Sequence, residues 1–436
     1  MRNIGTLIAG GGLAGLSTAF HLHEQPFLLI EKESRIGGLV KTEIIHDCTF
    51  DITGHWLHLR DDYTRGLVHD LLGDNLIEVS RRAMIFAHNR YINYPFQSNL
   101  ADLPPDIAAY CATEAVRSAL NRCRGKNKEI LTFRDFAIAH FGAGITREFI
   151  EPYNAKLWGV GIDQVTSDWC DRFVPVPDVI QIVKGAVQRQ GQSMGYNAKF
   201  LYPRTGGMES LPIALAGRLP SGKFMTGIPL RAIKHKQHSA LIGDEWVKYD
   251  TLISTMPLPV LAGMLQEAPS SVYHAADLLQ ASRLIYAVGA VHGAPLINGA
   301  HWLYLPDPDM PIYRFGVPSN VSASLAPAGM SSFYAEFTPT FKGGVRDAEN
   351  QVRRLLNDLG RDSEELAFLE MRKFPFGYVI FDQERNEAIQ NLSIFLSKKD
   401  IFSIGRFGAW TYNAMEDAIL DGRDMARRIK GEENGI

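Results

Sequence analysis

The stretch Thr6-Leu7-Ile8-Ala9-Gly10-Gly11-Gly12-Leu13-Ala14-Gly15 decides the fold of this chain. It joins a short apolar strand to a GxGxxG turn, and we expect a helix over residues 16–23. Gly10 allows the tight turn, Gly12 lets the backbone approach a pyrophosphate, and Gly15 lets the helix pack on the strand. The N–H groups at the start of that helix would face the phosphates of a bound dinucleotide.

A second apolar strand, Leu28-Leu29-Ile30-Glu31, ends in an acid sixteen residues after Gly15. The Glu31 carboxylate can accept hydrogen bonds from ribose hydroxyls, which favours an unphosphorylated ribose. A GxGxxG motif alone is a weak signal, since the chain has 39 glycines in 436 residues. The alternative, a glycine-rich turn without a ligand, does not explain why strand, helix and acid follow in the order of a βαβ unit.

A second glycine pair follows in Arg35-Ile36-Gly37-Gly38 and lets the chain pass close to an extended cofactor. Together with the first turn, it resembles the FAD-binding start of the amine oxidase, protoporphyrinogen oxidase and UDP-galactopyranose mutase superfamily. The resemblance implies an α/β fold (α+β overall) with a Rossmann-like FAD-binding domain of the glutathione-reductase type. It also implies FAD contacts at Gly10, Gly12, Leu13, Ala14, Gly15, Glu31, Lys32, Arg35, Gly37, Gly38, Leu39 and Leu230.

Near the end of the chain, an apolar strand over residues 401–404 leads through Gly405 into a new helix. This pattern predicts a second helix N-terminus that faces phosphates, and the alternative is a surface connection. The resemblance places Gly405 and Arg406 near the pyrophosphate and Met415 near the flavin. Tyr412 and Asn413 are expected beside them.

The motif Asp51-Ile52-Thr53-Gly54-His55-Trp56-Leu57-His58 looks like the loop that the mutases lay against the isoalloxazine ring. Gly54 would permit close approach of the backbone, and His55 would polarise flavin atoms. The competing interpretation is a core histidine that is bonded to backbone. For His58 we expect a structural role.

Residues 149–159 resemble the mutase segment whose tryptophan, here Trp158, lines the sugar pocket, and residues 90–96 match a loop that leads toward the same cavity. A nucleotide sugar needs cations for its diphosphate and aromatic rings for its sugar and base. The resemblance assigns these roles to Arg172, Arg283, Tyr313, Arg314 and Tyr412. For each arginine the alternative is a surface salt bridge.

This resemblance implies a redox-neutral sugar mutase, in which N5 of reduced FAD attacks the anomeric carbon. Two sugar-pocket positions depart from the mutase pattern, with Ala414 in place of an aspartate and Trp410 in place of a tyrosine. The segment that holds uridine in the mutases is replaced here by residues 173–177 and a longer insert through Asn197. The resemblance therefore does not identify the nucleotide of the substrate as UDP. An oxidase that removes a hydride from an amine or porphyrinogen stays open, as does a flavin-binding protein with a structural role.

The composition gives no sign of other partners. A net charge of −3 and the lack of basic blocks argue against nucleic acid, and no apolar run approaches the ~20 residues of a membrane span. The chain starts directly with its first strand, so we expect a cytoplasmic enzyme with a small-molecule substrate. Four separated cysteines predict reduced thiols and no metal site. The oligomeric state stays open.

We expect an interleaved domain order. Residues 1–85, 203–268 and 375–436 would form the FAD domain, residues 86–202 a largely helical insert, and residues 269–374 a sheet over the flavin. Strands are expected at residues 228–233, 239–242, 249–254, 284–291, 313–317 and 332–337, and a helix at 346–359.

Overall fold

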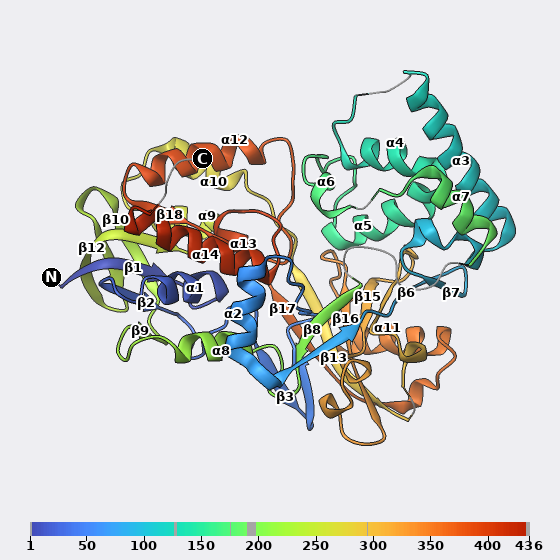
Figure 1. Ribbon diagram of the computed structural model, residues 1–436, viewed down its shortest axis with the longest axis horizontal. Coiled ribbons are helices and arrows are strands. Elements are labelled where there is room, and N and C mark those ends of the chain that lie inside the picture. The colour runs from blue at the N-terminus through green and yellow to red at the C-terminus, as the bar shows by residue number, and fades with distance from the viewer. Residues whose placement is uncertain (1, 126–128, 175, 190–197, 294, 433–436) are drawn as a thin grey trace.

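The computed structural model describes residues 2–125, 129–174, 176–189, 198–293 and 295–432. Figure 1 shows three parts: a sheet that contains the N-terminal strand, a cluster of helices, and a second sheet below these helices. The first sheet has the order β10-β11-β12-β1-β2-β9, and β18 pairs with β12. Its strands are β1 (Asn3–Ala9), β2 (Phe27–Ile30), β9 (Phe224–Met225), β10 (Leu230–Lys234), β11 (Ser239–Ile242), β12 (Glu245–Ser254) and β18 (Ile401–Ser403).

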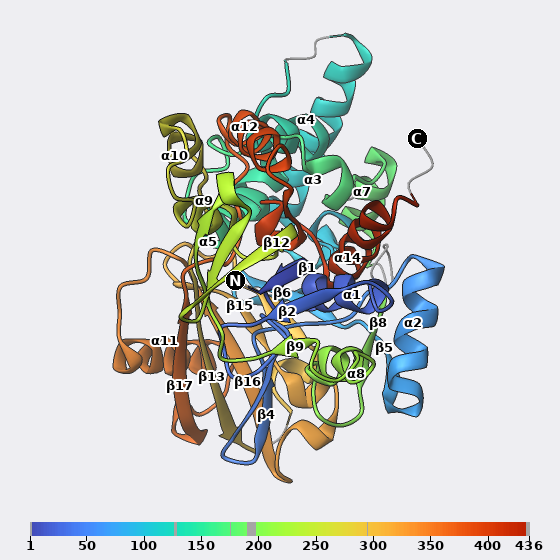
Figure 2. The same ribbon diagram turned by 90° about the vertical axis from the view of Figure 1, so that its left-hand side faces the viewer.

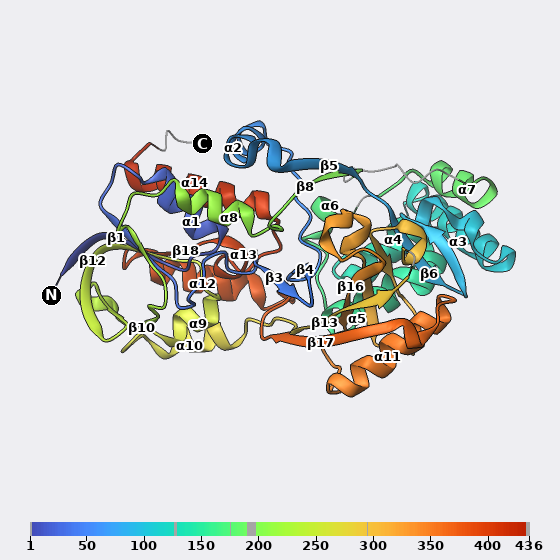
Figure 3. The same ribbon diagram turned by 90° about the horizontal axis from the view of Figure 1, so that it is seen from below.

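Strand β1 lies in the middle of this sheet and pairs in parallel with both β2 and β12. Residues Thr6–Ala9 and all of β2 are buried, as expected for strands that helices cover on both faces. Figures 2 and 3 show one group of helices on each face. One face carries α1 (Leu13–His21), α8 (Ser210–Gly217) and α14 (Met415–Lys430); the other carries α9 (Leu258–Gly263), α10 (Ser270–Asp277) and α12 (Arg385–Ser397).

The second sheet is mostly antiparallel and has the order β17-β13-β16-β15-β14-β6-β7. It consists of β6 (Ala83–Ala87), β7 (Arg90–Asn93), β13 (Leu284–His292), β14 (Trp302–Tyr304), β15 (Ile312–Gly316), β16 (Met330–Phe337) and β17 (Leu366–Phe374). Helix α11 (Val345–Asp358) buries Val352, Leu355 and Leu356 in the core of this part. The strands and the helix predicted between residues 284 and 359 are therefore confirmed.

The helical cluster, at the upper right of Figure 1, is built from α3 (Pro105–Cys123), α4 (Phe133–Ile145), α5 (Glu151–Trp158), α6 (Cys170–Phe173) and α7 (Val179–Val187). Thr132 caps α4 in a reciprocal pair with Asp135. The remaining strands and α-helices are β3 (Thr42–Ile45), β4 (Cys48–Asp51), α2 (Asp62–Leu72), β5 (Leu76–Ser80), β8 (Lys199–Pro203) and α13 (Gly405–Gly408).

The predicted fold class, a Rossmann-like FAD-binding fold with a second mixed sheet and a helical part, is confirmed. One boundary differs, because the limit predicted between residues 85 and 86 falls inside β6, and β6 pairs with β14 of the second sheet. The other domain limits stay a prediction. Within the described residues, no helix is both long and apolar enough to span a bilayer. All four cysteines are free thiols.

Candidate active site

The first glycine turn shows why two of its positions lack a side chain. Gly10 has a φ of +120°, and its N–H donates to the Ile30 carbonyl over 2.8 Å. A Cβ at Gly15 would collide with the carbonyl oxygen of Gly10. These two glycines are therefore explained by the fold itself.

Gly12 is different, because neither its backbone nor its neighbours require a glycine. Its φ is −78°, which any residue adopts, and a Cβ there would meet only the Cα of Gly38, at an ordinary 3.7 Å. Gly12 is the N-cap of α1 and has no side chain that could bond to the helix. The first N–H groups of this nine-residue helix therefore face the open side of the turn. Space beside a helix N-terminus fits the approach of a pyrophosphate.

Glu31 lies at the end of β2, beside this space. It is buried, and its carboxylate accepts from the N–H of Gly11 over 2.7 Å and from that of Glu33 over 2.9 Å. Each carboxylate oxygen keeps a further lone pair, which suits ribose hydroxyls. Gly37 donates to the Gly11 carbonyl over 2.8 Å and ties the second glycine pair to the first turn.

Other predicted cofactor residues have protein partners. Arg35 forms an ion pair with the buried Glu209 and donates to the Thr42 carbonyl over 2.8 Å. Lys32 is exposed and lies 3.6 Å from Glu33. Leu39 packs beside a small core cluster near β4, and Leu230 is buried at the start of β10. Their contact with FAD stays a prediction.

The second glycine motif meets the first through Gly405, whose φ is +77° and whose added Cβ would lie 2.9 Å from the Cβ of Ala14. Arg406 donates to the carbonyls of Asn413 and Gly377 over 3.0 and 3.3 Å. The buried Oδ1 of Asn413 has no hydrogen-bond partner among the described residues. An unpartnered buried acceptor next to a glycine motif is what a missing ligand leaves, so this side also fits a dinucleotide.

His55 lies where the two glycine motifs and the second sheet meet. Its Nδ1 bonds to the Ile52 carbonyl, which makes Nδ1 the protonated nitrogen of the neutral ring and leaves Nε2 as an acceptor. Burial lowers the pKa of His55 to about 4, and the charges of Arg406 and Arg314 act in the same direction. A Cβ at Gly54 would collide with the Tyr334 hydroxyl, so packing also accounts for this glycine, and its approach to the flavin stays a prediction.

An ion pair joins β15 and β16, two neighbouring strands of the second sheet. Arg314 on β15 donates from Nε and Nη2 to both carboxylate oxygens of Glu336 on β16, over 2.9 and 2.7 Å. The Tyr313 hydroxyl donates to the same carboxylate over 2.5 Å, and Arg314 also donates to the Tyr378 hydroxyl over 3.0 Å. Burial would lower the pKa of Arg314, but the Glu336 charge raises it well above the ordinary value.

Six tyrosines surround this ion pair, and we call them the tyrosine cluster: Tyr94, Tyr153, Tyr304, Tyr313, Tyr378 and Tyr412. The ring centroids of Tyr94 and Tyr153 each lie 5.1 Å from that of Tyr304, and Tyr378 stacks on Tyr412 at 6.1 Å. The cluster takes residues from all three parts of the molecule. Arg406 joins it, with its guanidinium carbon 4.9 Å from the Tyr412 ring centroid.

Three other residues predicted for the site, Trp158, Arg283 and Arg172, are not part of the tyrosine cluster. Trp158 is buried against Phe133 and Trp169, and it is Trp169 that reaches Tyr412, with 6.5 Å between ring centroids. Arg283 is exposed immediately before β13, where Gly377 donates to the carbonyl of its neighbour Ser282. Arg172 belongs to α6, but its side chain lies outside what the structure describes.

The sequence analysis did not identify Glu336, Tyr304, Tyr378, Trp169 or Lys156 as residues of this site. Lys156 is buried in α5 and donates to the carbonyls of Leu305, Asp307 and Ile312, over 2.6 to 2.9 Å. It thereby fixes the loop that joins β14 to β15. No group of three or more metal-ligating side chains occurs among the residues that the structure describes.

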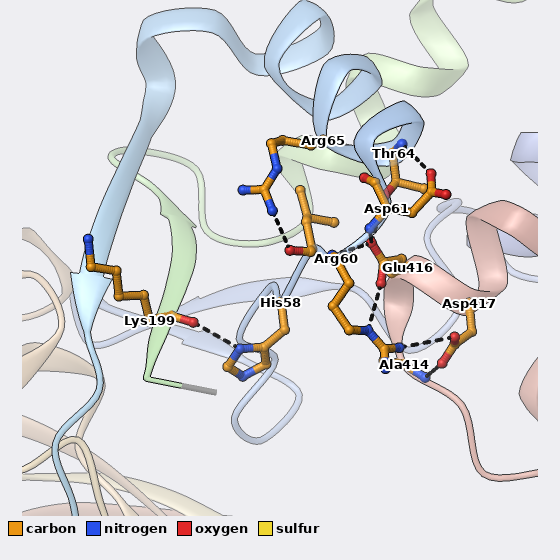
Figure 4. Close-up of polar contacts among 10 residues, drawn as sticks. His58, Arg60, Asp61, Thr64, Arg65, Lys199, Ala414, Glu416 and Asp417 are labelled. Atoms are coloured by element: carbon orange, nitrogen blue, oxygen red, sulfur yellow. Dashed lines mark hydrogen bonds and ion pairs between the residues drawn. The ribbon is translucent and has the colours of Figure 1, made fainter. Parts of the chain in front are cut away.

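Glu416 of α14 binds the segment that follows the motif of residues 51–58, as Figure 4 shows. This buried carboxylate accepts from the N–H groups of Arg60 and Asp61 over 2.6 and 2.9 Å, and from the Thr64 hydroxyl over 2.7 Å. Burial would raise the pKa of Glu416, but these bonds and the Arg60 side chain outweigh it and hold the pKa below the ordinary value. The start of α2 is therefore held beside Met415.

We expect Glu416→Ala to destabilise the protein by about 2 kcal/mol, because it leaves two part-buried backbone donors and the buried Thr64 hydroxyl without their acceptor. Since the folded pKa is depressed, this contribution is present above the ordinary carboxyl pKa of about 4.3 and lost as the pH falls below it. The measurement is the melting temperature at pH 7. Asp424→Ala on the same helix is the control, because Asp424 is exposed and pairs only with Arg423. An equal effect of both variants would contradict the role of Glu416.

Comparison with known proteins gives one family model and three similar solved structures. A family model described as "Flavin containing amine oxidoreductase" matches residues 13–367. A solved structure of a reduced UDP-galactopyranose mutase is 26% identical, with a TM-score of 0.92 over 99% of this chain and 96% of that one. A protein described as a protoporphyrinogen oxidase from Exiguobacterium sp. 255-15 is 17% identical, with a TM-score of 0.76 over 99% of both chains. A putrescine oxidase bound to putrescine is 16% identical, with a TM-score of 0.66 over 98% of this chain and 99% of that one.

Proposed function

This chain belongs to the family of flavin-containing amine oxidoreductases, and from that premise we propose that it is a nucleotide-sugar mutase that works with reduced FAD. It is a flavoenzyme, and FAD is its cofactor. The observation that carries the proposal is the likeness to a reduced UDP-galactopyranose mutase over nearly the full length of both chains. The two oxidases share the fold, but their low identity carries no statement about activity.

We assign the cofactor pyrophosphate to Gly12, the start of α1 and Arg406, and the ribose to Glu31. Bound in its reduced form, FAD would supply an electron-rich N5 atom that can displace a nucleoside diphosphate from an anomeric carbon. His55 stays neutral at pH 7, so its Nε2 would accept a hydrogen bond at the flavin's edge. Tyr412 and Tyr378 would line the place of the sugar.

The test is an anaerobic incubation of the FAD-loaded enzyme with a panel of nucleotide sugars, in the oxidised state and after reduction by dithionite. We expect conversion to an isomer of equal mass only when the flavin is reduced, because the reaction is redox-neutral overall. Chromatography and mass spectrometry separate the isomers. No turnover in the reduced state would contradict the proposal.

A second candidate is an oxidase of an amine or a porphyrinogen-like substrate. It is favoured by the Arg314–Glu336 pair, which neutralises one arginine that a diphosphate would need, and by the aromatic character of the tyrosine cluster. Hydride removal suits such an aromatic surrounding. Peroxide release in air from an amine or porphyrinogen panel, without isomerisation of nucleotide sugars, would favour this candidate over the mutase.

We expect Arg283→Ala to weaken nucleotide-sugar binding about tenfold, or about 1.4 kcal/mol, and to leave FAD in place. Arg283 is exposed next to residues 377–378, and none of the described carboxylates pairs with it, so its charge is available to a diphosphate. Titration calorimetry with the nucleotide sugar measures the effect. Lys373→Ala is the control, since Lys373 is an exposed cation opposite Ile285 on the neighbouring strand. Unchanged affinity would remove Arg283 from the site.

A further inference from the structure

Arg81 joins β5 to β6, close to the tyrosine cluster but outside every motif described above. Its backbone N–H donates to the Ala198 carbonyl over 2.8 Å, which fixes its place at the start of β8. Its side chain is half-buried, and the guanidinium carbon lies 4.9 Å from the centroid of the Tyr94 ring. The arginine therefore stacks on a ring that belongs to the cluster.

The charge of Arg81 is uncompensated. Across residues 2–125, 129–174, 176–189, 198–293 and 295–432, no carboxylate forms an ion pair with it and no acceptor takes a hydrogen bond from its guanidinium. The neighbouring arginines are paired, Arg314 with Glu336 and Arg60 with Glu416. A half-buried guanidinium without an acid partner has five donors free for an oxyanion.

His58 lies at the same place. Its Nδ1 bonds to the carbonyl of Lys199, the residue that follows Ala198, so the neutral ring carries its proton on Nδ1 and Nε2 has no partner among the described residues. Burial, together with the charges of Arg81 and Arg60, lowers the pKa of His58 to about 4. The surroundings of this ring are therefore electropositive, with Glu416 as the opposing charge.

We propose that Arg81 forms an anion-binding subsite at the edge of the tyrosine cluster and that this subsite takes a phosphate or carboxylate group of the substrate. The guanidinium fork matches the oxygens of either group, and the Tyr94 ring holds the fork in one plane. The statement that the anion belongs to the substrate rests on the proposed function. The binding of an oxyanion does not, because it is measured without turnover.

The experiment is titration calorimetry of the FAD-loaded enzyme with three probes: inorganic pyrophosphate, uridine diphosphate and D-galacturonate. Arg81→Gln removes the charge, and we expect it to weaken the binding of at least one probe tenfold or more. Loss for pyrophosphate and uridine diphosphate would identify a phosphate, and loss for galacturonate alone a sugar carboxylate. The flavin absorbance of each variant shows that the fold and the cofactor are retained.

Arg82→Gln is the matched control, because Arg82 is the next residue, is exposed, and among the described residues its side chain donates only to the Asn298 carbonyl. We expect it to change affinity less than twofold. Arg81→Lys keeps the charge without the fork and should bind with intermediate affinity.

Three results would overturn the subsite: an Arg81→Gln affinity within twofold of the parent for every probe, an equal loss in Arg82→Gln, or no binding of any probe to the parent enzyme at millimolar concentration. These results are separate from a failure of the mutase proposal. An enzyme that binds oxyanions through Arg81 but isomerises no nucleotide sugar would keep the subsite and lose the mutase assignment.

Discussion

Gly12→Val should yield a folded protein without flavin. A Cβ at residue 12 clears every described protein atom except the Gly38 Cα, which it meets at 3.7 Å, so the backbone and the sheet can form as before. The valine methyl groups would then fill the space between the two glycine motifs, where the pyrophosphate must approach the start of α1. We expect FAD affinity to fall at least about 100-fold, or about 2.7 kcal/mol.

The measurement is the ratio of flavin to protein absorbance after incubation with excess FAD, together with a far-ultraviolet circular dichroism spectrum. Gly66→Ala is the control, because Gly66 has open space around it on α2 and lies away from the glycine turn. It should retain full flavin. Full occupancy in Gly12→Val would show that the turn holds no pyrophosphate.

Glu336→Leu should destabilise the protein by about 3 kcal/mol, because it leaves the Arg314 charge and the Tyr313 hydroxyl buried without their acceptor. Glu336 is fully buried, so water cannot replace the lost carboxylate. In contrast, Arg314→Met combined with Glu336→Leu removes both charges, and we expect it to recover most of the loss. The loss of stability that remains in the double variant would come from the Tyr313 hydroxyl, which still lacks its acceptor.

Thermal unfolding followed by tryptophan fluorescence, at one fixed FAD concentration, measures these differences. We expect the melting temperature of Glu336→Leu to fall by about 5 °C or more and that of the double variant to fall less. Glu370→Gln is the control, since Glu370 forms a half-exposed pair with Arg372 that contributes at most about 1 kcal/mol. A double variant as unstable as Glu336→Leu would mean that the pair itself stabilises the sheet.

The parts of the fold that local sequence determines were predicted. The turn from Gly10 to Gly15 and the acid at Glu31 are close in sequence, and the apolar runs at residues 284–291 and 332–337 have the length and composition of buried strands. The placement of β6 in the second sheet was not predictable in this way. Its partner β14 lies more than 200 residues later, and such distant pairing leaves no local pattern.

The candidate site was predicted less completely, for a similar reason. Glu336 stands alone in an apolar strand, and its meaning depends on Arg314 lying opposite it on β15. Arg35 matches the family motif, but its partner Glu209 comes from a segment 174 residues away. Trp158 is the tryptophan that matches the mutase segment, but the tryptophan whose ring contacts Tyr412 is Trp169. Residue type and spacing therefore identified the segments that form the site. Tertiary packing decided which of their polar groups already have a protein partner and which keep a free donor or acceptor.

The pairing of β18 with β12 and the packing of α14 on α1 also bear on when the protein can acquire its cofactor during synthesis. A Cβ at Gly422 of α14 would lie 2.5 Å from the Ala14 carbonyl, so the two helices touch at backbone distance. At ribosomal speeds the closing segment emerges roughly 20–80 s after the glycine turn. On the proposed assignment of Arg406 to the cofactor, the nascent chain has until then only one half of its FAD site, and we expect a chain truncated before this segment to bind FAD weakly.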